Sequence, residues 1–205
     1  MINIVKDIDP INKTDDYDVI LVGTNTYGKL ANGWQLDMKI KYPQIHKANL
    51  STKYGDTSKV GKYLTIGESP TICLLYINKG YNFRPDLDPV FLEYDALEEC
   101  LYRINIEFKG KRVLAPILGS SKFDGNGDKK KIIEIFERLC TNLDVTLYDY
   151  EQISAREKTL KRIKSIMNAK SKAKETNDKT EYYKLISEKK EEEKKLKEIN
   201  RLINI

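Results

Sequence analysis

The first 150 residues of the chain alternate between short apolar runs and segments with helical spacing. The apolar runs are of strand length and cover residues 2–5, 18–22, 63–66, 71–77, 112–118 and 145–148. Two of them, 18–22 and 112–118, are continuously apolar after the first residue, as in strands that are buried on both faces. The segments between them predict an α/β fold, with a mostly parallel or mixed central sheet flanked by helices on both faces.

Three segments carry apolar side chains at the spacing of a helix that buries one face. Residues 33–42 would bury Trp34, Met38 and Ile40, and Pro43 would end that helix. The predicted helix at 90–105 would bury Leu92, Ala96, Leu97, Cys100, Leu101 and Ile104. The predicted helix at 130–139 would bury Ile132, Ile133, Ile135, Phe136 and Leu139. Residues 49–62 and 78–89 are predicted to be loops, and the run at 145–148 is predicted to close the sheet.

The composition changes after about residue 152. Glycine and proline are absent from residues 153–205, which hold 16 Lys and Arg against 9 Asp and Glu and so carry a net charge of +7. The whole chain carries +5, so residues 1–152 carry −2. This asymmetry predicts two modules, an α/β domain over residues 1–152 and a charged helical tail over residues 153–205.

The tail is predicted to form an α-helical hairpin or a coiled coil. Ser154 and Glu157 have the spacing of a capping box, and Asp178 with Glu181 would start a second helix after a polar break. The apolar stripe is thin, so we expect a protein partner or self-association through residues 153–205. Nucleic-acid binding is not expected, because Glu191–Glu193 interrupts the basic charge and interleaved Lys and Glu are typical of a solvated helix face.

Cysteine and histidine usage excludes several kinds of site. Cys73, Cys100 and Cys140 are odd in number, far apart and set in apolar runs, and the chain has one histidine, His46. We therefore expect buried thiols, no metal, no cofactor and a reducing cytoplasmic location. The sequence starts without a secretory signal pattern and has no membrane-length apolar stretch. Its abundance of Lys, Ile and Asn suggests an AT-rich genome, that of a phage or its host.

Two loops combine glycine with small polar residues. Gly23–Gly33 and Gly119–Asp128 each leave a buried strand and enter a predicted helix. Ligands of open α/β sheets bind at the carboxyl ends of strands, and amides at a helix N-terminus can hold phosphate. Two such loops on neighbouring strands could grip a diphosphate together, although glycine-rich turns of this kind also occur without any ligand.

The same residues resemble the macro domain, the ADP-ribose-binding fold. The run Val22-Gly23-Thr24-Asn25-Thr26-Tyr27-Gly28, then Gly33 and Lys41-Tyr42-Pro43, is similar to the first ligand loop of the family, most of all in viral, yeast and human ADP-ribose phosphatases and de-ADP-ribosylating enzymes. Tyr94–Leu97 resembles the opening of its central helix, and Val113–Gly119 with Gly125–Asp128 resembles its second ligand loop. The resemblance covers residues 1–150 and not the tail.

The resemblance implies roles for individual residues. Asp7 would contact the adenine, with Ile8 beside it among the ligand-binding residues, and Asn25 would contact the distal ribose. Asp128 would orient water as a general base, and Lys29 would act as a nucleophile or stabilise charge. The remaining ligand-binding residues would be Gly23, Gly33, Gly119, Ser120, Ser121, Lys122, Phe123, Gly125 and Gly127. Plainer interpretations stay open: Asn25 as a turn residue, Asp128 as a helix cap and Lys29 as a surface lysine.

The predicted function is binding of ADP-ribose or a related nucleotide, with hydrolysis of ADP-ribose 1''-phosphate or an ADP-ribosyl ester as the candidate activity. Two alternatives remain. The chain keeps only Gly33 in the stretch Leu30–Trp34, where the family has two or three glycines, and Ser121 replaces a glycine. These departures favour a non-catalytic nucleotide-signal reader or sequestering protein. A structural or assembly protein with a degenerate macro fold and an oligomerising tail is the other alternative.

Overall fold

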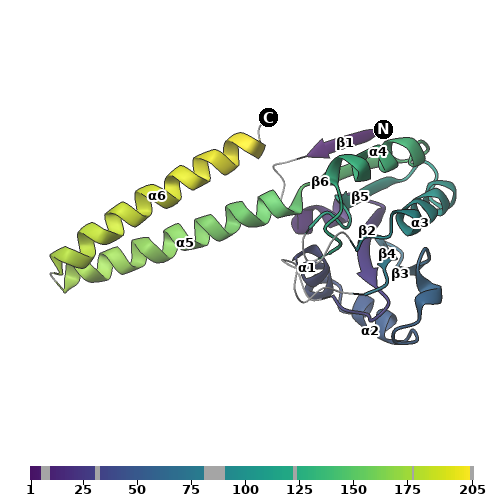
Figure 1. Cartoon of the computed structure of the whole chain (residues 1–205), viewed down its shortest axis with the longest axis horizontal. Helices are drawn as coiled ribbons and strands as arrows, with labels where there is room; N and C mark the ends of the chain where they lie inside the picture. Colours follow the sequence, from purple (N-terminus) through teal and green to yellow (C-terminus); the bar gives the residue numbers. More distant parts are fainter. Residues whose placement is uncertain (6–9, 31–32, 81–90, 122–123, 177, 204–205) are drawn as a thin grey trace. The chain divides into compact units, whose positions relative to one another are not determined.

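A computed structural model of the chain describes residues 1–5, 10–30, 33–80, 91–121, 124–176 and 178–203 (Figure 1). The chain divides into two compact units, Met1–Tyr150 and Glu151–Ile205. The elements of the first unit are, in chain order, β1 (Ile2–Val5), the 3-10 helix η1 (Pro10–Asp16), β2 (Val19–Asn25), α1 (Gly33–Lys41), α2 (Gln44–Leu50), the 3-10 helix η2 (Thr57–Lys59), β3 (Tyr63–Ile66), β4 (Thr71–Asn78), α3 (Tyr94–Glu107), β5 (Arg112–Pro116), α4 (Lys129–Leu139) and β6 (Asp144–Tyr148).

The six strands form one mixed sheet in the order β1-β6-β5-β2-β4-β3. Only β3 runs antiparallel to its neighbour, and the other four pairings are parallel. The predicted α/β fold with a mixed sheet is therefore confirmed. The strand at 144–148 does not close the sheet, because β1 pairs beyond it and forms the edge. That pairing joins residues about 140 positions apart, which spacing along the chain does not reveal.

Successive side chains of the central strands point to opposite faces of the sheet, and both faces are covered. Leu21, Cys73 and Leu75 share a buried cluster with α3 and α4. On the other face, Trp34 and Met38 of α1 and Ile45 of α2 are almost fully buried. All seven residues of β2 are buried, which confirms the two-sided burial expected from its continuous apolar run.

The region around Pro43 differs from the prediction. Helix α1 ends at Lys41, close to the expected stop, but α2 follows at once over seven residues that were partly assigned to a loop. Ile45 is fully buried and anchors α2 on the sheet. A segment of seven residues is too short for its apolar spacing to predict a helix. Ile40 was expected to point inward and is 69% exposed, because Trp34 and Met38 already define the inward face of α1.

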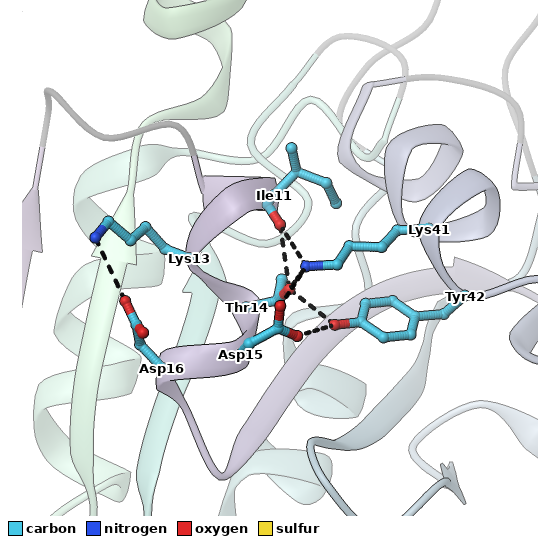
Figure 2. A network of polar contacts seen from close by, with 7 residues as sticks. All are labelled: Ile11, Lys13, Thr14, Asp15, Asp16, Lys41 and Tyr42. Atoms are coloured by element: carbon cyan, nitrogen blue, oxygen red, sulfur yellow. Dashed lines mark hydrogen bonds and ion pairs between the residues drawn. The ribbon is translucent and has the colours of Figure 1, made fainter.

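A polar network joins the end of α1 to η1 (Figure 2). The Lys41 ammonium donates to the main-chain oxygen of Ile11 at 3.0 Å, to Thr14 Oγ1 at 2.6 Å and to Asp15 Oδ2 at 3.0 Å. The Tyr42 hydroxyl donates to Asp15 Oδ1 at 3.0 Å. These bonds lower the pKa of Asp15 below its usual range. The Lys-Tyr pair of the Lys-Tyr-Pro motif thus holds the segment after β1 against α1.

The second unit is a pair of helices, α5 (Tyr150–Glu175) and α6 (Lys179–Ile203), that contact each other in the half nearer the turn that joins them (Figure 1). Ile166, Ala173 and Leu185 form its small core, and Arg162 pairs with Glu188 at 3.5 Å. Asp178 caps α6 by accepting from the Glu181 amide at 3.0 Å, as predicted. Helix α5 begins at Tyr150, so Ser154 lies inside it and does not start it.

The three cysteines of the first unit are free and buried, as expected. Burial raises the pKa of Cys100 and of Cys140 to about 12, so these thiols stay protonated near neutral pH. Within the described residues, no helix is both long enough and apolar enough to span a bilayer.

The first testable prediction concerns the core beneath α4. Phe136 is fully buried between α4 and the sheet, so Phe136→Ala removes a ring and leaves a cavity. We expect the free energy of unfolding to fall by about 3–5 kcal/mol, measured by urea denaturation. Tyr102→Ala, at a side chain that is 56% exposed, is the control and should change it by less than about 1 kcal/mol. Equal losses in the two variants would contradict the assigned core.

Candidate functional site

The two glycine-bearing loops meet at the carboxyl ends of β2, β4 and β5. Strand β2 lies between β4 and β5 and runs parallel to both, so the chain leaves all three strands at one edge of the sheet. Gln35 in α1, which follows the first loop, donates its side-chain amide to Asp124 in the second loop. Gly23 lies close to the same carboxyl, because a Cβ on Gly23 would be 3.6 Å from Asp124 Oδ2.

Asp124 is held from four directions. Its Oδ1 accepts from Gln35 Nε2, its Oδ2 accepts from the Gly119 amide at 3.2 Å, and its main-chain oxygen accepts from Asn78 Nδ2 at 2.8 Å. Its own amide donates to the Ser121 oxygen at 3.0 Å. Burial raises the pKa of the Asp124 carboxyl to about 7, against the lowering effect of the bonds from Gly119 and Gln35. A carboxyl of this kind can both accept and release a proton near neutral pH.

The second loop closes on itself through its backbone. The Gly127 amide donates to the Gly119 oxygen at 2.9 Å, and the Gly125 oxygen accepts from the amides of Phe91 and Leu92 at 3.0 and 3.1 Å. Gly125 has a φ of 151° and a Cβ there would lie 2.6 Å from the Gly119 oxygen. The glycines therefore serve close packing of the loop, whatever the loop binds.

Asn25 is almost fully buried at the end of β2 and organises the first loop. Its Oδ1 accepts from the amides of Tyr27 and Lys29 at 3.1 and 3.3 Å, and its Nδ2 donates to the Lys29 oxygen at 3.2 Å. This is the pattern of an Asx turn, the plainer of the two interpretations above. Contact of Asn25 with a ribose stays a prediction.

Asp128 caps helix α4. Its Oδ1 accepts from the Lys131 amide at 3.0 Å, and its own amide donates to the Tyr94 hydroxyl, which lies 2.8 Å away. The residue is exposed, whereas Asp124 is half-buried. Lys29 is also exposed. The catalytic roles of Asp128 and Lys29 stay predictions.

The other predicted ligand residues divide into two groups. Gly33 starts α1 with a φ of 49°, and the amide of Ser120 donates to the Ile117 oxygen at 3.2 Å, so both lie at the edge where the loops meet. Asp7, Ile8, Lys122 and Phe123 lie outside the described residues. No group of three or more His, Cys, Asp or Glu among the described residues is placed to hold a metal ion.

The pattern analysis missed Gln35, Asn78, Lys79 and Asp124. Asp124 follows Gly119 by five residues, and its position in a glycine-rich loop was a usable signal. Gln35 falls at an inward position of α1, where a polar residue needs a partner. Lys79 follows β4, where its main-chain oxygen accepts from Thr26 Oγ1 at 2.5 Å and its ammonium pairs with Glu93 at 2.9 Å. That position depends on the pairing of β2 with β4.

Comparison of the sequence with protein-family models and with curated proteins finds no match. Comparison of the fold with solved structures does. The macrodomain of Mycobacterium tuberculosis DarG has a TM-score of 0.54 at 19% identity and covers 73% of this chain and 97% of its own. The macrodomain of Thermus aquaticus DarG gives 0.53 at 16%, covering 73% and 98%.

The chain has a macrodomain fold. A third similar structure is Thermosipho africanus DarTG in complex with ADP-ribose, with a TM-score of 0.54 at 14% identity, covering 72% of this chain and 41% of that chain. At these identities the likeness establishes the fold, which confirms the resemblance seen in the sequence.

The raised pKa of the half-buried Asp124 makes the stability of the protein depend on pH. An aspartate whose pKa is raised on folding, from 3.8 to about 7, binds a proton more tightly in the folded state. Stability should therefore fall as pH rises from about 4 to 7, by at most about 1.4 kcal/mol per pH unit, and then level off. Asp124→Asn should lack this fall, which urea denaturation of both proteins between pH 4.5 and 8 would measure. Parallel curves for the two proteins would contradict the raised pKa.

Gly125 offers a test of the loop packing. Gly125→Ala should destabilise the protein by about 1–3 kcal/mol, because the added Cβ meets backbone at a φ that favours glycine. Gly80→Ala is the matched control, since a Cβ there meets nothing within 4 Å. Thermal denaturation of the two variants beside the parent protein gives the comparison. A loss in the Gly80 variant as large as in the Gly125 variant would rule out this account.

Proposed function

We propose that the macrodomain binds ADP-ribose or a nucleotide that carries an ADP-ribosyl group, and that it hydrolyses ADP-ribose 1''-phosphate or an ADP-ribosyl ester. The observation that carries the proposal is Asp124, a carboxyl with a pKa raised to about 7 where the two loops meet. The Thermosipho africanus structure of the same fold, described as a complex with ADP-ribose, supports the ligand class.

Asp124 is the proposed general base in place of Asp128. Near pH 7 about half of a carboxyl with this pKa is ionised, so it can accept a proton from an attacking water and later return it. In the hydrolysis, the oxygen of water bonds to C1'' of the substrate as the bond from C1'' to the phosphate or carboxylate oxygen breaks. The proton of the water passes to the Asp124 carboxylate, and the phosphate or carboxylate leaves as an anion. The side chain of Asp128 instead caps α4.

We propose that Lys79, in place of Lys29, is the lysine that stabilises negative charge at the site. It follows Asn78, whose side-chain amide holds the main chain of Asp124, and its own main chain is tied to Thr26 in the first loop. An ammonium group at this position would stabilise negative charge that develops on the leaving group. Release from Glu93, its present ion-pair partner at 2.9 Å, would accompany that role.

Calorimetry and turnover of the full chain test the proposal. We expect ADP-ribose to bind with a Kd of roughly micromolar, or about −8 kcal/mol. Asp124→Asn should keep that affinity within a few-fold and lower kcat by at least about 100-fold, since general-base catalysis contributes on that scale. Lys79→Met should lower kcat more than Lys29→Met does.

The same experiment shows which carboxylate, Asp124 or Asp128, is the general base. It also distinguishes an enzyme from a nucleotide-signal reader and from an assembly protein. Loss of turnover in Asp128→Asn, with turnover kept in Asp124→Asn, would return the catalytic role to Asp128. Binding without turnover in the parent protein would favour a nucleotide-signal reader. Absence of any binding heat would favour an assembly protein that uses a macrodomain fold.

Apolar side chains on α5 support the predicted contact of the tail with a partner or with a second copy of the chain. Leu160 and Met167 on α5 are 39% and 51% exposed, and Ile163 between them is partly exposed. Their spacing places them on one stripe of the helix, beside the small core of the pair. Sedimentation velocity of the full chain decides between self-association, which gives a concentration-dependent dimer, and a different protein partner, which leaves a monomer.

A further inference from the structure

Gln35 is a polar side chain at a buried position of α1. It is 9% exposed and lies between Trp34 and Met38, the two residues that anchor this helix on the sheet. An amide buried there without a partner would cost free energy, and an apolar side chain would pack at lower cost. The partner of Gln35 is the Asp124 carboxyl, 89 residues away along the chain.

The bond from Gln35 completes the support of that carboxyl. Gln35 Nε2 donates to one oxygen of Asp124 and the Gly119 amide donates to the other at 3.2 Å. With both oxygens engaged by donors on different segments, rotation of the carboxyl breaks at least one bond. The Gly119 donor is main chain and belongs to the same loop as Asp124, so the link to α1 depends on the side chain of Gln35.

Other charges nearby are already engaged. Lys79 at the end of β4 pairs with Glu93 of the segment before α3 at 2.9 Å. Asp128, in the same loop as Asp124, accepts from the Lys131 amide. The pKa of Asp124 therefore reflects burial, which raises it, against the donors Gly119 and Gln35, which lower it.

We infer that Gln35 is the positioning residue of the site: its amide fixes the Asp124 carboxylate in one orientation and favours the ionised form. Gln35 acts through Asp124. Its effect on turnover rests on the proposed function, whereas its effect on the carboxyl does not.

Carbon-detected NMR of the full chain, with labelled aspartate and no ligand, tests the inference. Gln35→Met keeps the length of the side chain and removes the donor. We expect the titration midpoint of Asp124, assigned with Asp124→Asn, to rise by about one pH unit, since a hydrogen bond to a charged group is worth that much. Leu36→Met, at an adjacent and 37% exposed position of α1, is the control and should leave the midpoint unchanged.

Gln35→Glu is a second variant, which keeps a polar side chain in case Gln35→Met does not fold. A carboxylate in place of the amide cannot donate and repels Asp124, so the pair should titrate in two steps with the higher midpoint above that of the parent protein. An unchanged Asp124 midpoint in whichever variant folds would overturn the inference.

Turnover adds a readout that a merely structural role would not move. If the proposed function holds, Gln35→Met should shift the acidic limb of the pH–rate profile upward by the same amount and lower kcat more than it changes KM. A moved NMR midpoint in a protein without turnover would uphold the role of Gln35 and reject the proposed function. A fixed midpoint with normal turnover would do the reverse.

Discussion

The parallel pairing of β2 with both β4 and β5 is the constraint on which the candidate site depends. It brings the ends of three strands to one edge of the sheet, so that Gly23, Asn78 and Gly119 lie around a single side chain, Asp124. The pairing is itself stabilised by burial on both faces, with α3 and α4 on one and α1 and α2 on the other. Donors on three separate segments hold Asp124, which favours a preorganised arrangement.

Most polar groups at this edge have structural duties. Asn25 shapes the first loop, Asp128 caps α4, and the second loop closes through its own backbone. Asp124 differs, because burial disfavours the ionised form of its carboxyl and raises its pKa. Hydrogen bonds from Gly119 and Gln35 offset part of this effect. Functional sites commonly hold perturbed carboxyls of this kind, although structural networks do so as well. The raised pKa therefore matters most in combination with its position at the strand ends, where ligands of α/β folds bind.

The helical pair is stabilised differently from the α/β unit, because it buries far fewer apolar side chains. Its small core of Ile166, Ala173 and Leu185 leaves most of the two helices covered by Lys and Glu. Isolated helices of this kind gain little from propensity and depend on packing, so a stripe such as Leu160, Ile163 and Met167 matters for how the unit is stabilised. Nothing in the candidate site calls for the tail. The proposed nucleotide binding and the proposed contact with a partner rest on residues of different units.

The sequence alone determined the class of fold, the type of most of the longer elements and the change of composition near residue 152. Continuous apolar runs have few options other than buried strands, and Asp178 caps α6 through a purely local bond. Tertiary structure decided the rest. The order of strands put β1 at the edge and β6 inside, and the buried side chains of Ile45 and Asn49 supported a helix of seven residues that the local pattern does not predict. It also made Asp124, and not Asp128, the carboxyl with the raised pKa, and it supplied hydrogen bonds to Asp124 from Gln35 and Asn78, which lie far away in the chain. Local pattern records what a residue prefers, whereas the pKa and the partners of a side chain are set by neighbours that only folding supplies.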